Sequence, residues 1–313
     1  MWKSILLCAG LAMCLVGCGA AAEDAAIEED AASVQNTQTE DATETQETEN
    51  TEESITAEKA EQSNTEAEDS KVSLEGLSLS ILGDSISTYD EWTVEGGVIF
   101  YPFNGEVTDV SQTWWKRLLD DTGMELCSNN SSSGSTCVGD SMNIDNPKYA
   151  CSSYRLSLLT GRQGKMPDVI IVYMGTNDVL NGVPIGDNDG TKLVEEGTIE
   201  NFSDAYCLIL DKLASEYPAA EIYCCTLPPI GDWGTDQPFV TFENELGLTS
   251  RDYSQQIEDI ADSKNITVID LSDCGIEIDN LDEMTTDGVH PTPAGMECLE
   301  QVIYEKLCGM DQK

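Results

Sequence analysis

The sequence is short of histidine and of basic residues. It contains one histidine, His290, and 15 Lys and Arg against 59 Asp and Glu, so the 313 residues carry a formal net charge of −44. One imidazole is too few for a zinc site with mixed Cys and His ligands, and none of the cysteines forms a CxxC pair. The shortage of cations argues against nucleic acid as a partner, because phosphate backbones are bound through Lys and Arg. It also argues against electrostatic docking on anionic lipid.

The N-terminal apolar run is too short to span a bilayer comfortably. It covers residues 5–16, follows a single cation, Lys3, and has the plan of a secretory signal. It ends in Leu15-Val16-Gly17-Cys18, which resembles the lipobox of bacterial lipoproteins, where the signal is cleaved before a cysteine that carries the lipid. We therefore expect a signal peptide over residues 1–17 and lipidation of Cys18. The alternative is an ordinary signal peptide with an incidental cysteine.

Large apolar side chains are almost absent from Gly19 to Ser70, which holds 17 acidic residues and one basic residue, Lys59. Such a composition cannot offset the entropy lost on ordering, so residues 18–70 are expected to form a disordered tether from the lipidated cysteine. The folded domain is expected over residues 71–313, outside the cytoplasm on the surface of a bacterium. Subtracting the tether and Lys3 from the totals leaves 42 acidic and 13 basic residues, which suits a neutral or cationic substrate.

Twelve cysteines divide into two groups. Cys8 and Cys14 lie in the expected signal and Cys18 is the expected anchor. The remaining nine are an odd number, so they cannot all pair within the chain; they are Cys127, Cys137, Cys151, Cys207, Cys224, Cys225, Cys274, Cys298 and Cys308. Most lie in apolar stretches, as buried small hydrophobic residues do. The sequence does not decide whether Cys127 and Cys137 form a disulfide.

From residue 77 onward, the pattern alternates between expected strands and expected helices. Strands are predicted at residues 77–82, 124–127, 168–174, 221–226 and 266–271. Helices are predicted from a Ser111 cap to Gly123, and over residues 202–216, 250–264 and 293–308. This alternation predicts an α/β fold with a parallel sheet of about five strands covered on both faces. Residues 88–110 and 182–197 are expected to be rim loops that shape a pocket at the carboxyl ends of the strands.

Four short motifs follow these elements, and each could also have a purely structural role. Ser85, in Gly83-Asp84-Ser85, could be a nucleophile if a base takes its proton, but the tripeptide is also a good turn. The base would be His290, with Asp287 three residues earlier to orient it, or this histidine only caps the last helix. Asn177 could donate to an oxyanion or simply end a strand in a turn. Gly134 lies in a polar loop and permits close approach of a carbonyl to its N–H.

Together the motifs resemble the blocks of the SGNH (GDSL) hydrolase family. The matches are Ser85 in ILGDSIS, Gly134 in NNSSSGS, Asn177 in GTND, and Asp287 with His290 in DGVHP. The resemblance extends over residues 77–307 and implies a three-layer α/β/α flavodoxin-like fold and ester hydrolysis without a metal or other cofactor. It implies an oxyanion hole made of the backbone N–H groups of Ser85 and Gly134 and the Asn177 side chain. Asp84 is interpreted as a structural acid of the turn.

The substrate is less well defined by the sequence. There is no long apolar loop to cover a fatty acyl chain, which favours a short-acyl esterase, with O-acetyl groups of glycans as candidates. Aromatic residues of the expected rim suit sugar rings, although local packing explains them equally; they are Tyr89, Trp92, Phe100, Tyr101, Phe103 and Trp233. The alternatives are a lipase or lysophospholipase of the same family and a non-catalytic glycan-binding lipoprotein. Nothing in the sequence selects an oligomeric state.

Overall fold

The computed structural model describes residues 73–232 and 238–309. The expected signal peptide, Cys18 and the tether therefore lie outside the described residues, as does Trp233. The central element is a five-stranded sheet made of β1 (Ser78–Gly83), β2 (Glu125–Ser131), β4 (Val169–Tyr173), β6 (Glu221–Cys225) and β7 (Thr267–Ile269). The strands are in the order β2-β1-β4-β6-β7 and every pair is parallel. The predicted α/β fold with about five parallel strands is confirmed.

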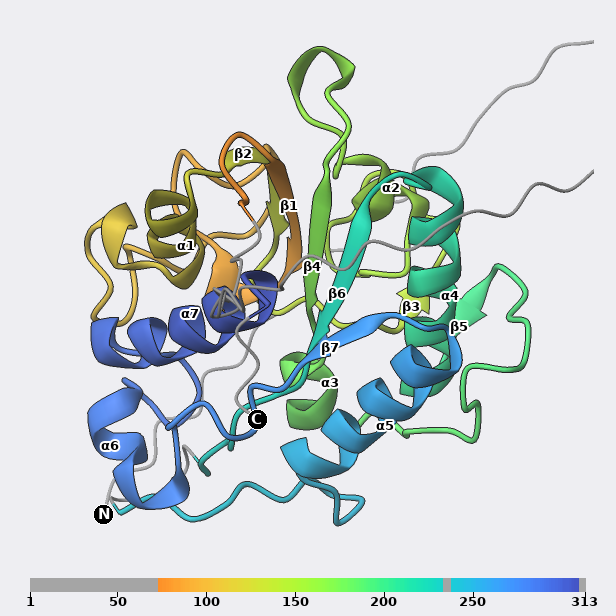
Figure 1. The fold of residues 1–313 in the computed structure, drawn as a ribbon. Coiled ribbons are helices and arrows are strands. Elements are labelled where there is room, and N and C mark those ends of the chain that lie inside the picture. Colours follow the sequence, from red (N-terminus) through yellow and green to blue (C-terminus); the bar gives the residue numbers. More distant parts are fainter. Residues whose placement is uncertain (1–72, 233–237, 310–313) are drawn as a thin grey trace, which may run out of the picture. The chain divides into compact units, whose positions relative to one another are not determined.

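Two helical layers cover the sheet (Figure 1). Helices α1 (Trp114–Thr122) and α7 (Pro293–Leu307) lie on one side, and α4 (Phe202–Glu216) and α5 (Ser250–Ser263) lie on the other. The three-layer α/β/α arrangement explains the sequence of β4, VIIVY, in which every residue is buried because helices cover both faces of a central strand. Among the described helices, none has the length and apolar character needed to cross a bilayer.

Short elements connect the layers. They are β3 (Gly139–Asp140), paired with β5 (Thr198–Ile199), the small helices α2 (Ser153–Ser157), α3 (Thr176–Leu180) and α6 (Leu281–Met284), and 3-10 turns at Ser85–Ser87, Val110–Gln112, Arg162–Gly164 and Ile278–Asn280. Apart from the turn that begins at Ser85, these elements are not predicted from the sequence, because elements of two to five residues are too short to show a hydrophobic period.

The start of α1 differs from the prediction. Ser111 lies in the 3-10 turn before the helix, and Asp109 caps that turn through the backbone N–H of Ser111. Thr113 is the cap of α1, where its hydroxyl accepts from the N–H of Lys116 at 3.3 Å. The helix ends at Gly123 as predicted, in the left-handed conformation that glycine adopts without strain.

Three loops of the sheet begin at the same level. Gly83, the last residue of β1, pairs with Ser131 at the end of β2 on one side and with Tyr173 at the end of β4 on the other. The segments that follow these residues therefore emerge side by side at the carboxyl edge of the sheet, where α3 lies beyond the end of β4 (Figure 1). Ligands bind at this edge in open α/β sheets.

Candidate active site

Ser85 lies on the tight 3-10 turn that follows β1 directly. The Asp84 side chain caps this turn by accepting from the backbone N–H of Ile86 at 3.0 Å, as expected of a structural acid. Two tryptophans of α1 also bind this turn. Trp114 Nε1 donates to Ser87 Oγ at 3.1 Å, and Trp115 Nε1 donates to Ser87 O at 3.0 Å. A turn fixed at several points keeps the Ser85 side chain in one position.

His290 and Asp287 meet on the loop before α7. His290 Nε2 lies 2.9 Å from Ser85 Oγ, and its Nδ1 lies 2.8 Å from Asp287 Oδ2. The other carboxylate oxygen, Asp287 Oδ1, accepts from the backbone N–H of His290 at 2.8 Å and of Val289 at 3.1 Å. Gly288 makes the tight return possible, since its φ of 87° falls in the left-handed region.

The charge of Asp287 determines the tautomer of His290. Burial opposes ionisation of Asp287, but the hydrogen bond of His290, its charge when it is protonated, and the two backbone N–H groups outweigh it, so the pKa of Asp287 lies below its usual value. An ionised carboxylate can only accept hydrogen bonds, so Nδ1 carries the proton of a neutral imidazole. Nε2 is then free to accept from the Ser85 hydroxyl, as a general base must.

Asn177 and Gly134 follow the two strands that flank β1. Asn177 is on α3, and its Nδ2 is buried with no hydrogen-bond partner among the described residues. Gly134 is exposed, has a φ of 74°, and a Cβ added there would meet no atom within 4 Å. The backbone N–H groups of the two adjacent residues are hydrogen-bonded, since Ser133 N donates to Val98 O and Ser135 N donates to Ser132 O. The structure thus places an unpaired amide and an exposed glycine at the same sheet edge as Ser85.

Asp178, which the sequence analysis did not select, anchors the loop that contains Gly134. Its carboxylate accepts from Cys137 N at 2.9 Å and from Val138 N at 3.4 Å. Burial raises the pKa of Asp178 to about 7, although these N–H groups oppose the shift. The only signal in the sequence is its position next to Asn177, since its partners are backbone groups forty residues away.

Arg155 is a second residue that the sequence analysis did not select. It is fully buried on α2, where Nη2 donates to Gly83 O and Asn130 O, both at 2.8 Å, and Nε donates to Asn130 Oδ1 at 3.0 Å. The guanidinium therefore holds the ends of β1 and β2 together directly before Ser85. Burial lowers the pKa of Arg155 to about 10, and burial raises the pKa of nearby Asp84 against the opposing charges of His290 and Arg155.

The two predicted rim loops have different positions. Residues 88–110 do reach the site, because the Phe100 ring stacks on His290 with centroids 3.7 Å apart. Residues 182–197 run along the outer helical layer, where Asn188 Nδ2 donates to Asp204 Oδ1 on α4 and Gln256 Nε2 on α5 donates to Asn188 O. Polar side chains thus bind the central part of this second loop to α4 and α5, and its role in shaping the pocket stays a prediction.

The described cysteines are all free thiols. Cys127 contacts the backbone of Leu159 and Lys165, whereas Cys137 is buried beside Asp178 and its carbonyl accepts from Cys151 N at 3.2 Å. The candidate bridge between Cys127 and Cys137 is therefore not formed in the structure. Among the described residues, no group of three or more His, Cys, Asp or Glu side chains is arranged to hold a metal ion.

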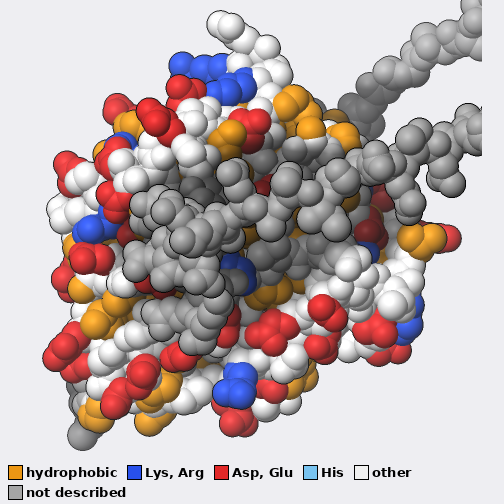
Figure 2. Space-filling view, in the orientation of Figure 1, with side chains coloured by type: hydrophobic (Ala, Val, Ile, Leu, Met, Phe, Trp, Pro, Cys, Tyr) orange, Lys and Arg blue, Asp and Glu red, His pale blue; other side chains and the backbone are white. Residues whose placement is uncertain are grey.

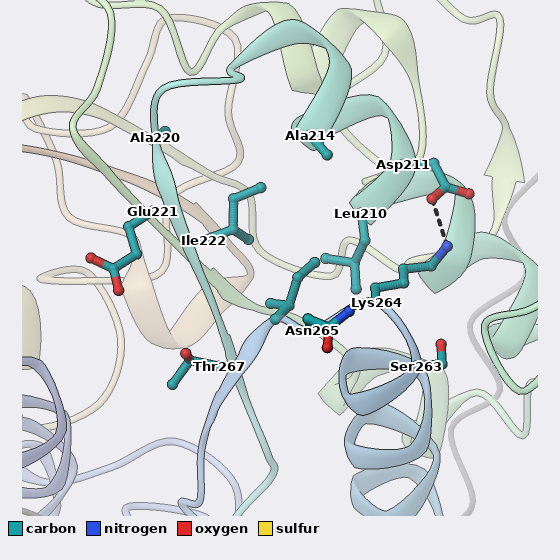
Figure 3. A pocket seen from close by; sticks show the side chains of 11 residues that line it. Leu210, Asp211, Ala214, Ala220, Glu221, Ile222, Ser263, Lys264, Asn265 and Thr267 are labelled. Atoms are coloured by element: carbon teal, nitrogen blue, oxygen red, sulfur yellow. Dashed lines mark hydrogen bonds and ion pairs between the residues drawn. The ribbon is translucent and has the colours of Figure 1, made fainter. Parts of the chain in front are cut away.

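A hollow of about 550 Å³ lies at the opposite edge of the sheet, at the amino ends of β6 and β7 (Figure 3). Its lining includes Leu210, Ile222 and Ile266, and Lys264 Nζ pairs with Asp211 Oδ1 at 2.5 Å beside it. Ser263 and Lys264 line this hollow without an imidazole beside them, because the one histidine of the sequence, His290, lies at the carboxyl edge.

Comparison with known proteins agrees with the fold and the motifs. Residues 77–232 match the family model described as "GDSL-like Lipase/Acylhydrolase". The chain is similar to a crystal structure described as a GDSL-like lipase from Bacteroides ovatus, with 26% identity, a TM-score of 0.54, and coverage of 74% of this chain and 98% of that chain. A second such structure, from Bacteroides uniformis, has 27% identity, a TM-score of 0.54, and coverage of 74% and 95%. No curated protein matches the chain.

The fold, the site geometry and the family match define the class of protein as a carboxylic ester hydrolase. Within that class, the chain belongs to the SGNH (GDSL) hydrolase family, as the four motifs had indicated.

Proposed function

We propose that the protein is a serine esterase that hydrolyses short-acyl carboxylic esters, with O-acetyl groups of glycans as candidate substrates. The observation that carries the proposal is the continuous row from Ser85 Oγ through the His290 ring to Asp287 Oδ2, with contacts of 2.9 Å and 2.8 Å. Both distances lie in the range required for proton transfer between a nucleophile, its base and the group that orients the base.

The proposed reaction has two halves. Ser85 Oγ attacks the ester carbonyl carbon while its proton passes to His290 Nε2, and the tetrahedral intermediate collapses when Nε2–H protonates the departing alcohol. Water then attacks the acyl-enzyme, gives its proton to Nε2, and releases the carboxylic acid as Ser85 regains its proton. Asp287 stays ionised throughout and stabilises the imidazolium formed in each half.

The negative charge on the carbonyl oxygen needs donors that are already in place. We assign this role to the backbone N–H groups of Ser85 and Gly134 and to Asn177 Nδ2. The buried, unpartnered state of Asn177 Nδ2 supports the assignment, since a buried donor is costly unless a ligand completes its hydrogen bond. Such donors contribute most when they are fixed before the reaction begins.

A short acyl group and a sugar alcohol fit what surrounds this site. The segment next to His290 carries exposed apolar side chains, Trp92, Val98 and Phe103, but no long apolar run that would cover a fatty chain. Of these rings, Trp92 packs on Trp115 with centroids 5.8 Å apart, and Phe103 is 68% exposed and open to contact with a sugar. The acidic surface excludes polyanions electrostatically and leaves neutral acetylated glycans acceptable.

The test compares p-nitrophenyl acetate with p-nitrophenyl palmitate on the wild-type protein and on Ser85→Ala. We expect a higher kcat/KM for the acetate, and a loss on the order of 10³-fold or more in Ser85→Ala, because the nucleophile is gone. A preference for palmitate would identify a lipase instead. Undiminished hydrolysis by Ser85→Ala would refute the mechanism, and failure of a fluorophosphonate probe to label Ser85 would favour a non-catalytic binding role.

A further inference from the structure

The face of the catalytic imidazole is covered by a residue outside the four family motifs. The Phe100 ring lies parallel to the His290 ring, with centroids 3.7 Å apart and an angle of 10° between the planes. Ser85 and Asp287 contact the imidazole ring of His290 only at its edge, through Nε2 and Nδ1. Two contacts at the edge define a line but leave tilting about that line free, so the ring plane depends on a contact made to its face.

Phe100 is bound to the turn that contains Ser85. Its backbone N–H donates to Thr88 Oγ1 at 3.0 Å, and the same hydroxyl donates to Ser85 O at 2.9 Å. Thr88 is fully buried, so these bonds have no competition from water. One hydroxyl therefore couples the position of Phe100 to that of the nucleophile.

The next residue binds the same segment to the histidine loop. Tyr101 Oη donates to Pro291 O at 3.0 Å, directly after His290, and Tyr101 O accepts from Asp90 N at 3.0 Å. The Tyr101 ring is fully buried and meets the Phe100 ring edge-on, with centroids 4.8 Å apart. Phe100 is thus held from both sides of the site, by the serine turn and by the histidine loop.

We propose that Phe100 is a positioning residue for His290, an inference that rests on the proposed serine esterase function. Its ring keeps the imidazole in the plane in which Nε2 faces Ser85 Oγ, and its π-face stabilises the imidazolium that forms during attack. The last torsion of a histidine side chain is broad and only weakly restrained by itself. A displacement of about 1 Å at a reacting group lowers the rate by roughly 100-fold.

The test measures kcat and KM for p-nitrophenyl acetate with full-length Phe100→Ala, Phe100→Leu and Phe100→Tyr. We expect kcat to fall about 10- to 100-fold in Phe100→Ala with KM within about threefold of wild type, because the base is misplaced while a small ester still binds. Phe100→Leu keeps most of the volume without the flat ring, so it should lose kcat as well and covers the case in which the alanine variant does not fold. Phe100→Tyr restores the ring and should restore kcat.

Tyr304→Ala is the matched control, because it removes a half-buried aromatic ring from α7 beside Leu74 and Cys308, away from the site. Its kcat should stay within about twofold of wild type. If Ser85→Ala is inactive and folded Phe100→Leu keeps wild-type kcat, the positioning role of Phe100 is refuted and the proposed function stands. If Ser85→Ala remains active, the proposed function fails, and the role of Phe100 fails with it.

Discussion

Asp287 uses its two carboxylate oxygens for different partners, and this division determines the effect of an isosteric change. Oδ1 accepts from two backbone N–H groups, those of Val289 and His290, while Oδ2 accepts from the His290 ring. An amide in the same place would turn its oxygen toward the two backbone donors. Its NH₂ group would then face Nδ1 and favour the tautomer that carries its proton on Nε2.

We therefore expect Asp287→Asn to lower kcat for p-nitrophenyl acetate by on the order of 10²- to 10⁴-fold, with KM changed little. The cause is a histidine whose Nε2 can no longer accept from Ser85. Steady-state kinetics measure this directly, and Asp279→Asn, at an exposed position in the 3-10 turn before α6, is the control. Equal kcat values for the two variants would show that Asp287 does not orient the base.

The residues that hold the loops of the site in place could not be found from short sequence motifs. Ser85, Asn177 and His290 are recognisable because they lie in short patterns at fixed positions relative to expected elements. Asp178 and Arg155 act on backbone groups distant in the sequence, Cys137 N and Gly83 O, and no local pattern reports such a partner. Phe100 was recognised only as an aromatic residue of the rim, since its stacking on His290 depends on how the loop folds.

At the scale of elements, long buried segments were predicted well and polar or short ones were not. The helix over Phe202–Glu216 has the predicted bounds, because its buried positions repeat with a helical period. Strand β2 continues to Ser131, four residues beyond the prediction, although its last residues are polar. Their side chains are buried and satisfied, for example by the bond from Ser128 Oγ to Leu158 O and from Asn129 Nδ2 to Ser87 O.

Helix α7 carries a buried acid that makes stability depend on pH. Glu300 is 7% exposed, and its Oε1 has no hydrogen-bond partner among the described residues. Burial, with the nearby charge of Asp121 and against that of Arg117, raises the pKa of Glu300 from 4.5 to about 7. Because the folded-state pKa is above the unfolded value, the stability that Glu300 contributes is fully present below pH 4.5 and is lost as the pH rises through 7.

Glu300→Gln removes this ionisation, so we expect it to raise the free energy of unfolding at pH 8 by at least about 1 kcal/mol and to have less effect at pH 5. Urea denaturation at the two pH values measures the difference. Glu283→Gln is the control, since Glu283 is an exposed residue of α6 whose charge does not act on Glu300. The same stability change at both pH values would mean that Glu300 does not titrate between them.

The whole molecule is dominated by negative charge. Figure 2 shows acidic side chains spread over the visible face with few Lys and Arg between them, in line with 42 acidic and 13 basic residues from Lys71 onward. Such a surface is repelled by anionic lipid rather than attracted to it. Electrostatic attraction would therefore not hold this protein at a membrane, whereas a lipid on the cysteine of the N-terminal motif would.

We propose that Cys18 carries that anchor and that residues 18–70 hold the hydrolase domain away from the bilayer. Cys18→Ser should move the protein from the membrane fraction to the soluble fraction and abolish incorporation of a labelled fatty acid, while kcat for p-nitrophenyl acetate stays within about twofold, because the site lies wholly within the folded domain. Cys127→Ser, which alters a half-buried thiol of the folded domain, is the control and should leave the protein in the membrane. Retention of Cys18→Ser in the membrane fraction would contradict a lipid anchor at this residue and leave the proposed ester hydrolysis intact.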